Sequence, residues 1–191
     1  CIFYICKKNI LMDTRKFAMN YGALLGTLLV FIGFLFHFMN ILDFERPFLV
    51  ISINTILMYF VLFFSIKSFR DLYNDGFINY SKCVKIGITV SVFSAFIFGL
   101  WKMLLINYIN VEYVELSIQK QQQLILEMDE KIPTMFDDVD SVLDEIEMQS
   151  SDSNSPFRLI FNEIMSKAFG GFLLSSIIYF FVKKEDPNLI S

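Results

Sequence analysis

The chain has 191 residues, 55% of them hydrophobic, and its 16 basic and 20 acidic side chains give a formal net charge of −4. Soluble globular domains are typically about 45–50% apolar, whereas here the excess falls in blocks of about 20 residues, the length that crosses a bilayer. The acidic balance excludes a basic nucleic-acid-binding surface, so we expect no nucleic-acid partner.

The first eleven residues precede Met12, which is followed by a short polar stretch and then by the first apolar block. We expect residues 1–11 to be upstream sequence or a disordered tail, with a short amphipathic cytoplasmic tail as the alternative. We expect residues 12–191 to form a single membrane domain. The first apolar block is too long for a signal peptide, and no small-x-small cleavage site follows it.

Four apolar blocks predict four transmembrane helices, over about 17–39, 47–66, 84–108 and 164–182. The apolar runs are continuous rather than alternating, which favours helices over β-strands. A helix also satisfies its own backbone hydrogen bonds in lipid. The predicted fold class is therefore an all-α membrane protein with four transmembrane helices. Ser155-Pro156 is typical of a helix start and predicts that the last helix begins ahead of its apolar block.

Three of the four blocks carry small residues at helical spacing, which allows the backbones of neighbouring helices to approach closely in lipid. These residues are Gly22, Gly26, Gly33, Gly87, Ser91, Ala95, Gly99, Gly171 and Ser175. Two interpretations stay open. The stripes pack the helices of one chain together, or at least one of them drives homodimerisation.

Asn54 and Lys102 are polar residues inside apolar blocks, and such residues are functional candidates by default. Asn54 and its neighbour Thr55 either line a polar path or make one interhelical hydrogen bond. Lys102 either extends to the membrane surface or lies on an ion pathway. His37, the only histidine, lies near the outer end of the first block, where an interfacial position is favoured over a metal site.

The segment between the third and fourth blocks, about 110–162, is predicted to be a helical, extracytoplasmic insertion. It holds twelve acidic residues and three basic ones. Its first part has a heptad-like apolar spacing that ends at Pro133, and a second amphipathic helix is predicted from Thr134. The acidic cluster from Asp137 to Glu145 lacks the glycine of a calcium-binding loop. We interpret it as a solvated helix face and predict no metal site.

Basic residues gather on one side of a four-span topology, which predicts that both termini are cytoplasmic. They are Arg15, Lys16, Lys67, Arg70, Lys82, Lys85, Lys183 and Lys184. The acidic insertion then lies on the far side of the membrane.

The loop between the second and third blocks reads FRDLYNDGFINYSK from Phe69 to Lys82, and Asn107-Tyr108-Ile109-Asn110 follows the third block. Together with a start of the form MetxxxxFxxxYG from Met12 to Gly22, these stretches resemble a membrane family of unknown function. The family is domain of unknown function 4199, mostly from bacteria of the Bacteroidetes group. The likeness extends to about Pro187.

The resemblance implies four spans and a location in the bacterial inner membrane, and it implies no activity, substrate or catalytic residue. Two departures from the family pattern stand out. Asp75-Gly76 replaces a Gly-Gly pair, and Val111 stands where the family commonly has proline. Since proline would kink the chain, its absence leads us to expect one long helix from the third block to Gln121 and beyond.

The loop between the second and third blocks is expected to lie on the inner membrane surface, with its basic side chains facing anionic headgroups. The residues assigned to this membrane-surface loop are Arg70, Asp75, Gly76, Phe77, Lys82 and Lys85.

No catalytic motif or nucleophilic combination of serine, cysteine and histidine is present in the sequence. We therefore expect no enzymatic activity, no catalytic residues and no cofactor. The preferred hypothesis is a membrane protein that acts through helix packing and through protein contacts of its acidic insertion, with the bilayer and a homo-oligomer or another membrane protein as partners. The alternative is an oligomeric transporter or channel-like protein with a polar path near Asn54, Thr55 and Lys102.

Overall fold

The computed structural model describes residues 14–39, 46–74, 76–110, 112–131, 138–153 and 155–183. Within these ranges, four helices are long and apolar enough to cross a membrane. They are α2 (Thr14–Phe38), α3 (Pro47–Tyr73), α4 (Tyr80–Leu104) and α7 (Pro156–Val182). The predicted all-α fold with four spanning helices is confirmed, and the chain is a multi-pass membrane protein. The expectations for residues 1–11 lie outside the described residues.

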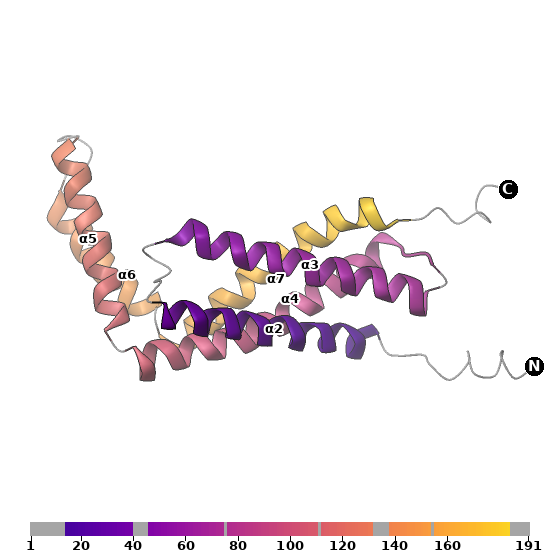
Figure 1. The fold of residues 1–191 in the computed structure, drawn as a ribbon. Coiled ribbons are helices and arrows are strands. Elements are labelled where there is room, and N and C mark those ends of the chain that lie inside the picture. Colours follow the sequence, from indigo (N-terminus) through magenta and orange to yellow (C-terminus); the bar gives the residue numbers. More distant parts are fainter. Residues whose placement is uncertain are drawn as a thin grey trace, which may run out of the picture.

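The four spanning helices lie alongside one another, and two shorter helices project from one end of the bundle (Figure 1). These shorter helices, α5 (Tyr113–Lys131) and α6 (Val139–Ser153), pack against each other. We call this end of the bundle the hairpin end. The opposite end, where α2 begins and α7 ends, is the terminal end. Pro133 and Thr134, where the second short helix was expected to start, lie outside the described residues.

Three of the spanning helices extend at one end beyond the apolar blocks that predict them. Helix α3 continues to Tyr73, α4 starts at Tyr80 and α7 starts at Pro156. The apolar block marks only the part of a helix that suits hydrocarbon, and the helix itself continues until a local signal stops it.

Those local signals are visible at the helix ends. Pro47 and Pro156 occupy the first turns of α3 and α7, where a missing backbone N–H costs nothing. The side chain of Asn79 caps α4 by accepting a hydrogen bond from the backbone N–H of Lys82 at 3.1 Å. Gly76, in the turn between α3 and α4, has a φ of 86°, a conformation that favours glycine.

The expectation of one continuous helix from the third span to Gln121 is wrong. Helix α4 passes into a π-helical turn, η1 (Leu105–Ile109), and the chain leaves the helix at Asn110 with φ −126° and ψ 76°. The backbone N–H of Asn110 bonds to the carbonyl of Leu105 at 2.7 Å and closes the wide turn. Asparagine readily leaves a helix because its side chain competes for backbone hydrogen bonds, so the break needs no proline.

Helix α4 packs against both α2 and α7, and glycines make these contacts close. A Cβ added at Gly22 or Gly26 of α2 would lie 2.9 Å from the Cβ atoms of Phe93 or Ile97 on α4. A Cβ added at Gly99 of α4 would lie 3.1 Å from a backbone atom of α7. Real Cβ atoms essentially never lie within 3.0 Å of a neighbouring side chain, so Gly22 and Gly26 require glycine as the bundle stands. At Gly99 a side chain would require α7 to shift by a few tenths of an ångström.

The closest approach lies between α4 and α7, where small residues face each other in two reciprocal pairs. A Cβ at Gly87 would lie 2.4 Å from the Cβ of Ser175, and a Cβ at Gly171 would lie 2.1 Å from Oγ of Ser91. Ala95, on the same stripe, is fully buried. The small residues of α4 and α7 therefore face each other within one chain.

At the terminal end, Arg70 departs from the membrane-surface role expected for it. Its side chain is buried, pairs with Asp71 at 2.7 Å and donates from Nη1 to the carbonyl oxygen of Val182 at 2.8 Å. Val182 is the last residue of α7, so its carbonyl has no partner within the helix. Arg70 thus caps α7 and complements the negative end of the helix dipole. Lys82 and Lys85 are exposed, and Asp75 lies outside the described residues.

Replacing Arg70 by methionine should lower the free energy of unfolding by about 1.5–3 kcal/mol, because a charged hydrogen bond to a buried carbonyl is lost. Lys85→Met, at an exposed position of the same end, should change it by less than about 0.5 kcal/mol. Titration of the detergent-solubilised protein with a denaturing detergent would measure both. Equal effects of the two substitutions would show that the Arg70 cap adds nothing to stability.

Candidate functional site

The polar residues of the spanning helices meet at the hairpin end, beside a cavity of about 710 Å³. Helices α3 and α7 form its walls, α4 forms its floor, and the first residue of α5 reaches its edge. Its size falls within the range of about 300–1,000 Å³ that is usual for small-molecule sites. The lining residues that carry polar groups are Asn54, Thr55, Lys102, Tyr113, Glu163, Ser166 and Lys167.

Three of these side chains are charged and form one ionic cluster. Nζ of Lys102, on α4, lies 3.0 Å from Oε1 of Glu163 on α7. Nζ of Lys167, one turn further along α7, contacts the other carboxylate oxygen of Glu163. The Glu163 and Lys167 side chains are only 15% and 13% exposed, and Lys102 is 26% exposed. The cluster therefore links two spanning helices and carries two positive charges against one negative charge.

The second lysine of the cluster also rests on an aromatic ring. Nζ of Lys167 lies 4.4 Å from the centre of the Phe98 ring, within the range of a cation–π contact. Phe98 is buried on α4 and lines the cavity. The ring and the carboxylate together hold the ammonium group at the cavity wall.

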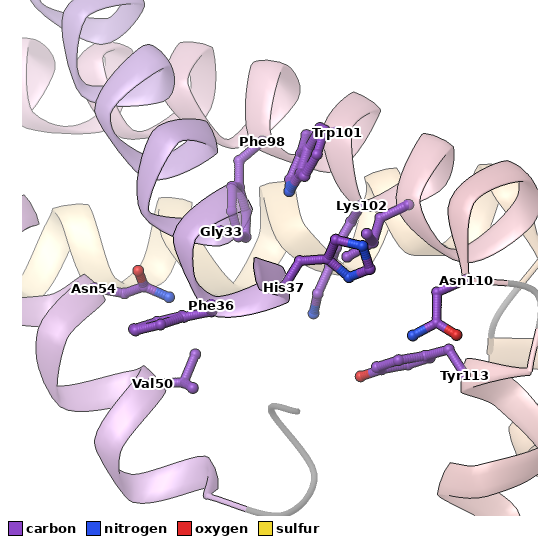
Figure 2. A pocket seen from close by; sticks show the side chains of 11 residues that line it. Gly33, Phe36, His37, Val50, Asn54, Phe98, Trp101, Lys102, Asn110 and Tyr113 are labelled. Atoms are coloured by element: carbon purple, nitrogen blue, oxygen red, sulfur yellow. The ribbon is translucent and has the colours of Figure 1, made fainter. Parts of the chain in front are cut away.

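A second, smaller space of about 50 Å³ adjoins the cavity and shares five lining residues with it, among them Asn54 and Lys102. Figure 2 shows the side chains of this space between α2, α3, α4 and the start of α5, with His37 from the end of α2 among them. Its volume suits a few ordered waters. Gly33 keeps the α2 side of this space tight, because a Cβ there would lie 2.8 Å from Nε1 of Trp101.

The structure thus brings together the residues that the sequence singled out as intramembrane polar candidates. Asn54 and Lys102 line both spaces, while Thr55 lines the larger one and His37 the smaller one. Lys102 forms an interhelical ion pair with Glu163.

Sequence reasoning missed Glu163 and Lys167. Glu163 fell just outside both the predicted insertion, about 110–162, and the predicted fourth block, about 164–182, while Lys167 lay inside that block but was not singled out. A signal was present. The two residues are four positions apart, in the order Glu then Lys that stabilises a helix. Since a helix start was already predicted at Pro156, both charges could have been placed inside the last helix.

Metal-ligating side chains and a thiol also occur among the described residues. No group of three His, Cys, Asp or Glu side chains among the described residues lies close enough to hold a metal ion. Cys83 is buried, and its thiol donates to the backbone carbonyl of Ser175 at 3.3 Å. The ionic cluster is therefore the main concentration of charge inside the spanning helices that the structure describes.

Comparison with known proteins identifies a family but no activity. No curated protein and no solved structure matches this chain. The family described as "Protein of unknown function (DUF4199)" matches residues 20–184, which include all four spanning helices apart from the first turns of α2. Because the match covers most of the sequence, the chain belongs to the DUF4199 family.

Proposed function

We propose that this multi-pass membrane protein is a non-enzymatic binding protein for an anionic ligand, and that its binding site is the cavity between α3 and α7. The observation that carries the proposal is the ionic cluster of Lys102, Glu163 and Lys167 on the cavity wall. Two ammonium groups contact this one carboxylate, so cationic side chains from two helices line the cavity. An anion that enters the cavity would meet both ammonium groups.

The location of this site favours binding over a purely structural role. Ionisable groups inside spanning helices are costly to keep and usually mark a functional path or site. The reciprocal glycine–serine contacts already hold α4 against α7, so the ion pair is not needed to bring the two helices together. A cavity beside the cluster leaves room for a ligand.

We further propose that the terminal end faces the bacterial cytoplasm and that the hairpin end faces the outside of the inner membrane. Arg15, Lys16, Lys67 and Lys82 are exposed at the terminal end, and the positive-inside rule places such residues on the cytoplasmic side. The acidic insertion lies at the other end. The cavity would then open toward the extracytoplasmic half of the bilayer.

Iodide quenching of Trp101, the only tryptophan, tests whether Lys102 attracts anions to the cavity. Trp101 lines the smaller space next to Lys102, so an anion drawn to the lysine should reach the indole. In Lys102→Met, the iodide quenching constant should fall about threefold, the enrichment that one unit charge gives at about 7 Å in water. Quenching by neutral acrylamide should stay unchanged.

Lys82→Met is the matched control, because it removes a lysine from the far end of the same helix. It should leave iodide quenching at the wild-type level. If iodide quenches Trp101 in the Lys102→Met variant as strongly as in the wild type, the cavity does not attract anions and the proposal fails.

A second candidate function is protein binding by the α5–α6 hairpin, which was the preferred hypothesis from the sequence. Exposed apolar side chains stand among its acidic residues and favour this role: Leu116, Leu124, Leu126 and Met148. The transporter alternative needs a path through the terminal half of the bundle. There Leu25, Leu62 and Ile86 are fully buried, so a path would require a rearrangement.

A further inference from the structure

We infer that α5 is an interfacial helix, which lies along the membrane surface at the hairpin end and has the lipid headgroup region as its partner. The side of α5 that begins with Tyr113 and Ser117 and continues with Leu124 and Met128 contacts the lipid where the helix extends beyond the bundle. This surface is separate from the ionic cluster, so the inference does not depend on the proposed anion-binding function.

The lipid-facing surface of the spanning helices reaches their last turns at the hairpin end. Exposed apolar and aromatic side chains stand at the start of α3 (Phe48), in η1 (Tyr108 and Ile109) and at the start of α7 (Phe157). Tyrosine is enriched where the hydrocarbon meets the headgroups, and Tyr108 is 75% exposed. The headgroup region therefore lies at the level of η1, directly before α5.

Helix α5 does not continue the direction of α4. In Figure 1, α4 runs along the bundle, whereas α5 runs across its end and extends past its edge. The π-helical turn η1 and a tight turn after it change the direction of the chain, and the backbone N–H of Tyr113 bonds to the carbonyl of Asn110 at 3.1 Å. Because spanning helices lie close to the bilayer normal, a helix that crosses the bundle lies along the membrane plane.

The first turn of α5 shows which side of this helix faces the bundle. Tyr113 lines both cavities, and Figure 2 shows its ring in the same space as His37 from the end of α2. Ser117, one turn further on the same side, is only 6% exposed. Leu124 and Met128 follow on this side after steps of seven and four residues, which correspond to about two turns and one turn. Both are exposed, so neither α6 nor the bundle covers them.

Beyond the bundle, this side of α5 has the chemistry of an interfacial helix. Contact with lipid removes its half-exposed apolar side chains from water, which is favourable. Lys120, also exposed on this side, has a stem long enough to place its ammonium group among the headgroups. Glu115 and Asp129 lie on other sides of the helix, and Glu127, at the edge, accepts a hydrogen bond from Gln123 at 3.0 Å.

Lipid suits this side of α5 better than a second copy of the chain does. Helix α6, which packs beside α5, has five acidic residues and no basic residue, so pairing two hairpins would bring like charges together. A zwitterionic lipid surface has no net charge and offers apolar contact without this repulsion. The contact would also continue the lipid-facing surface that Tyr108 and Ile109 already form.

Nitroxide labels on single introduced cysteines test the inference on the full chain in phosphatidylcholine nanodiscs. Cys1 and Cys6 are replaced by serine, and Cys83 is buried and stays unlabelled. Collisions of the label with oxygen, which concentrates in lipid, are compared with collisions with a water-soluble nickel chelate. Labels at Leu124→Cys and Met128→Cys should collide mainly with oxygen.

Leu126→Cys is the matched control. Leu126 is 51% exposed, close to the 47% of Leu124, but two residues further along the helix it lies on the nearly opposite side. A label there should collide mainly with the nickel chelate.

Leu124→Glu tests whether the apolar contact holds the helix on the membrane. A carboxylate loses hydration when it is pressed into lipid, so this variant should lift the outer part of α5. Collisions of a label at Met128→Cys with the nickel chelate should then rise to the level found at Leu126→Cys. Leu126→Glu should leave the label at position 128 unchanged. Both leucines are half-exposed, so neither substitution disturbs a buried contact.

The remaining outcomes overturn the inference. If the label at position 124 collides with the nickel chelate as often as the label at position 126 does, α5 lies in water. If the labels at positions 124 and 128 are shielded from both reagents, protein covers this side, and spin–spin broadening would identify that protein as a second copy. Iodide quenching in Lys102→Met depends only on the cavity, so the anion site and the interfacial helix fail separately.

Discussion

Replacing Gly171 by leucine is expected to prevent α4 and α7 from packing, whereas the same change at the adjacent Gly170 leaves the bundle folded. At Gly171 a Cβ would lie 2.1 Å from Oγ and 2.6 Å from Cβ of Ser91, so even the first atom of a side chain has no room. At Gly170 the nearest atom is 3.5 Å away and belongs to a flexible methionine. Denaturing-detergent titration and size-exclusion elution in mild detergent would measure the difference.

A smaller side chain at position 171 allows the cost of the clash to be measured as a free energy of unfolding. Gly171→Ala should lower the free energy of unfolding by about 1–3 kcal/mol, the usual cost of overpacking. Adding Ser91→Gly should recover most of that loss, because it removes both atoms that a Cβ at position 171 would meet first. The Ser91 hydroxyl is buried, and within the described ranges it has no hydrogen-bond partner, so its removal costs little. Additive losses in the double variant would show that the clash with Ser91 is not the cause.

The spanning helices could be predicted from the sequence, but their ends and their packing partners could not. A hydropathy block measures how well a segment suits lipid, and that property identified four spanning helices correctly. It does not report where a helix ends, because Asn79, Pro156 and Gly76 set those ends through local backbone geometry. The small-residue stripes were visible as patterns, but which stripe meets which depends on how the helices are arranged.

The terminal end shows why an exposed role was wrongly expected for Arg70. In the sequence this arginine stands among other basic residues near a predicted loop, which indicates a membrane surface. Its actual partner is the carbonyl of Val182, 112 positions away along the chain. The sequence does not reveal a free carbonyl at the end of a helix, because any residue at position 182 would have the same backbone group.

The candidate site was predicted only in part for a similar reason. Asn54 and Lys102 were noticeable because each interrupts an apolar block. The carboxylate that pairs with Lys102 lies on α7, and only the packing of α4 on α7 brings the two within 3.0 Å. The cavity itself depends on the separation between α3 and α7, which no local pattern encodes.

Glu163→Gln is expected to be the most destabilising change within the ionic cluster. It leaves the ammonium groups of Lys102 and Lys167 near each other without the carboxylate that both contact. Removing one partner from a buried ion pair typically costs about 3–5 kcal/mol, because the remaining charge stays poorly solvated. Lys167→Met should cost less, since Glu163 keeps Lys102 as a partner and the cluster becomes neutral. The free energy of unfolding in a denaturing detergent would rank the two variants.

The double variant Glu163→Gln with Lys167→Met decides whether electrostatics is the cause. With Lys167 removed, a single lysine at position 102 remains, and its long side chain can extend toward the membrane surface. The double variant should therefore be more stable than Glu163→Gln alone, a non-additive result that is expected only for residues in one charged network. If the two losses simply add, the cluster is held by packing, and the electrostatic coupling of Lys102, Glu163 and Lys167 would lose its energetic support.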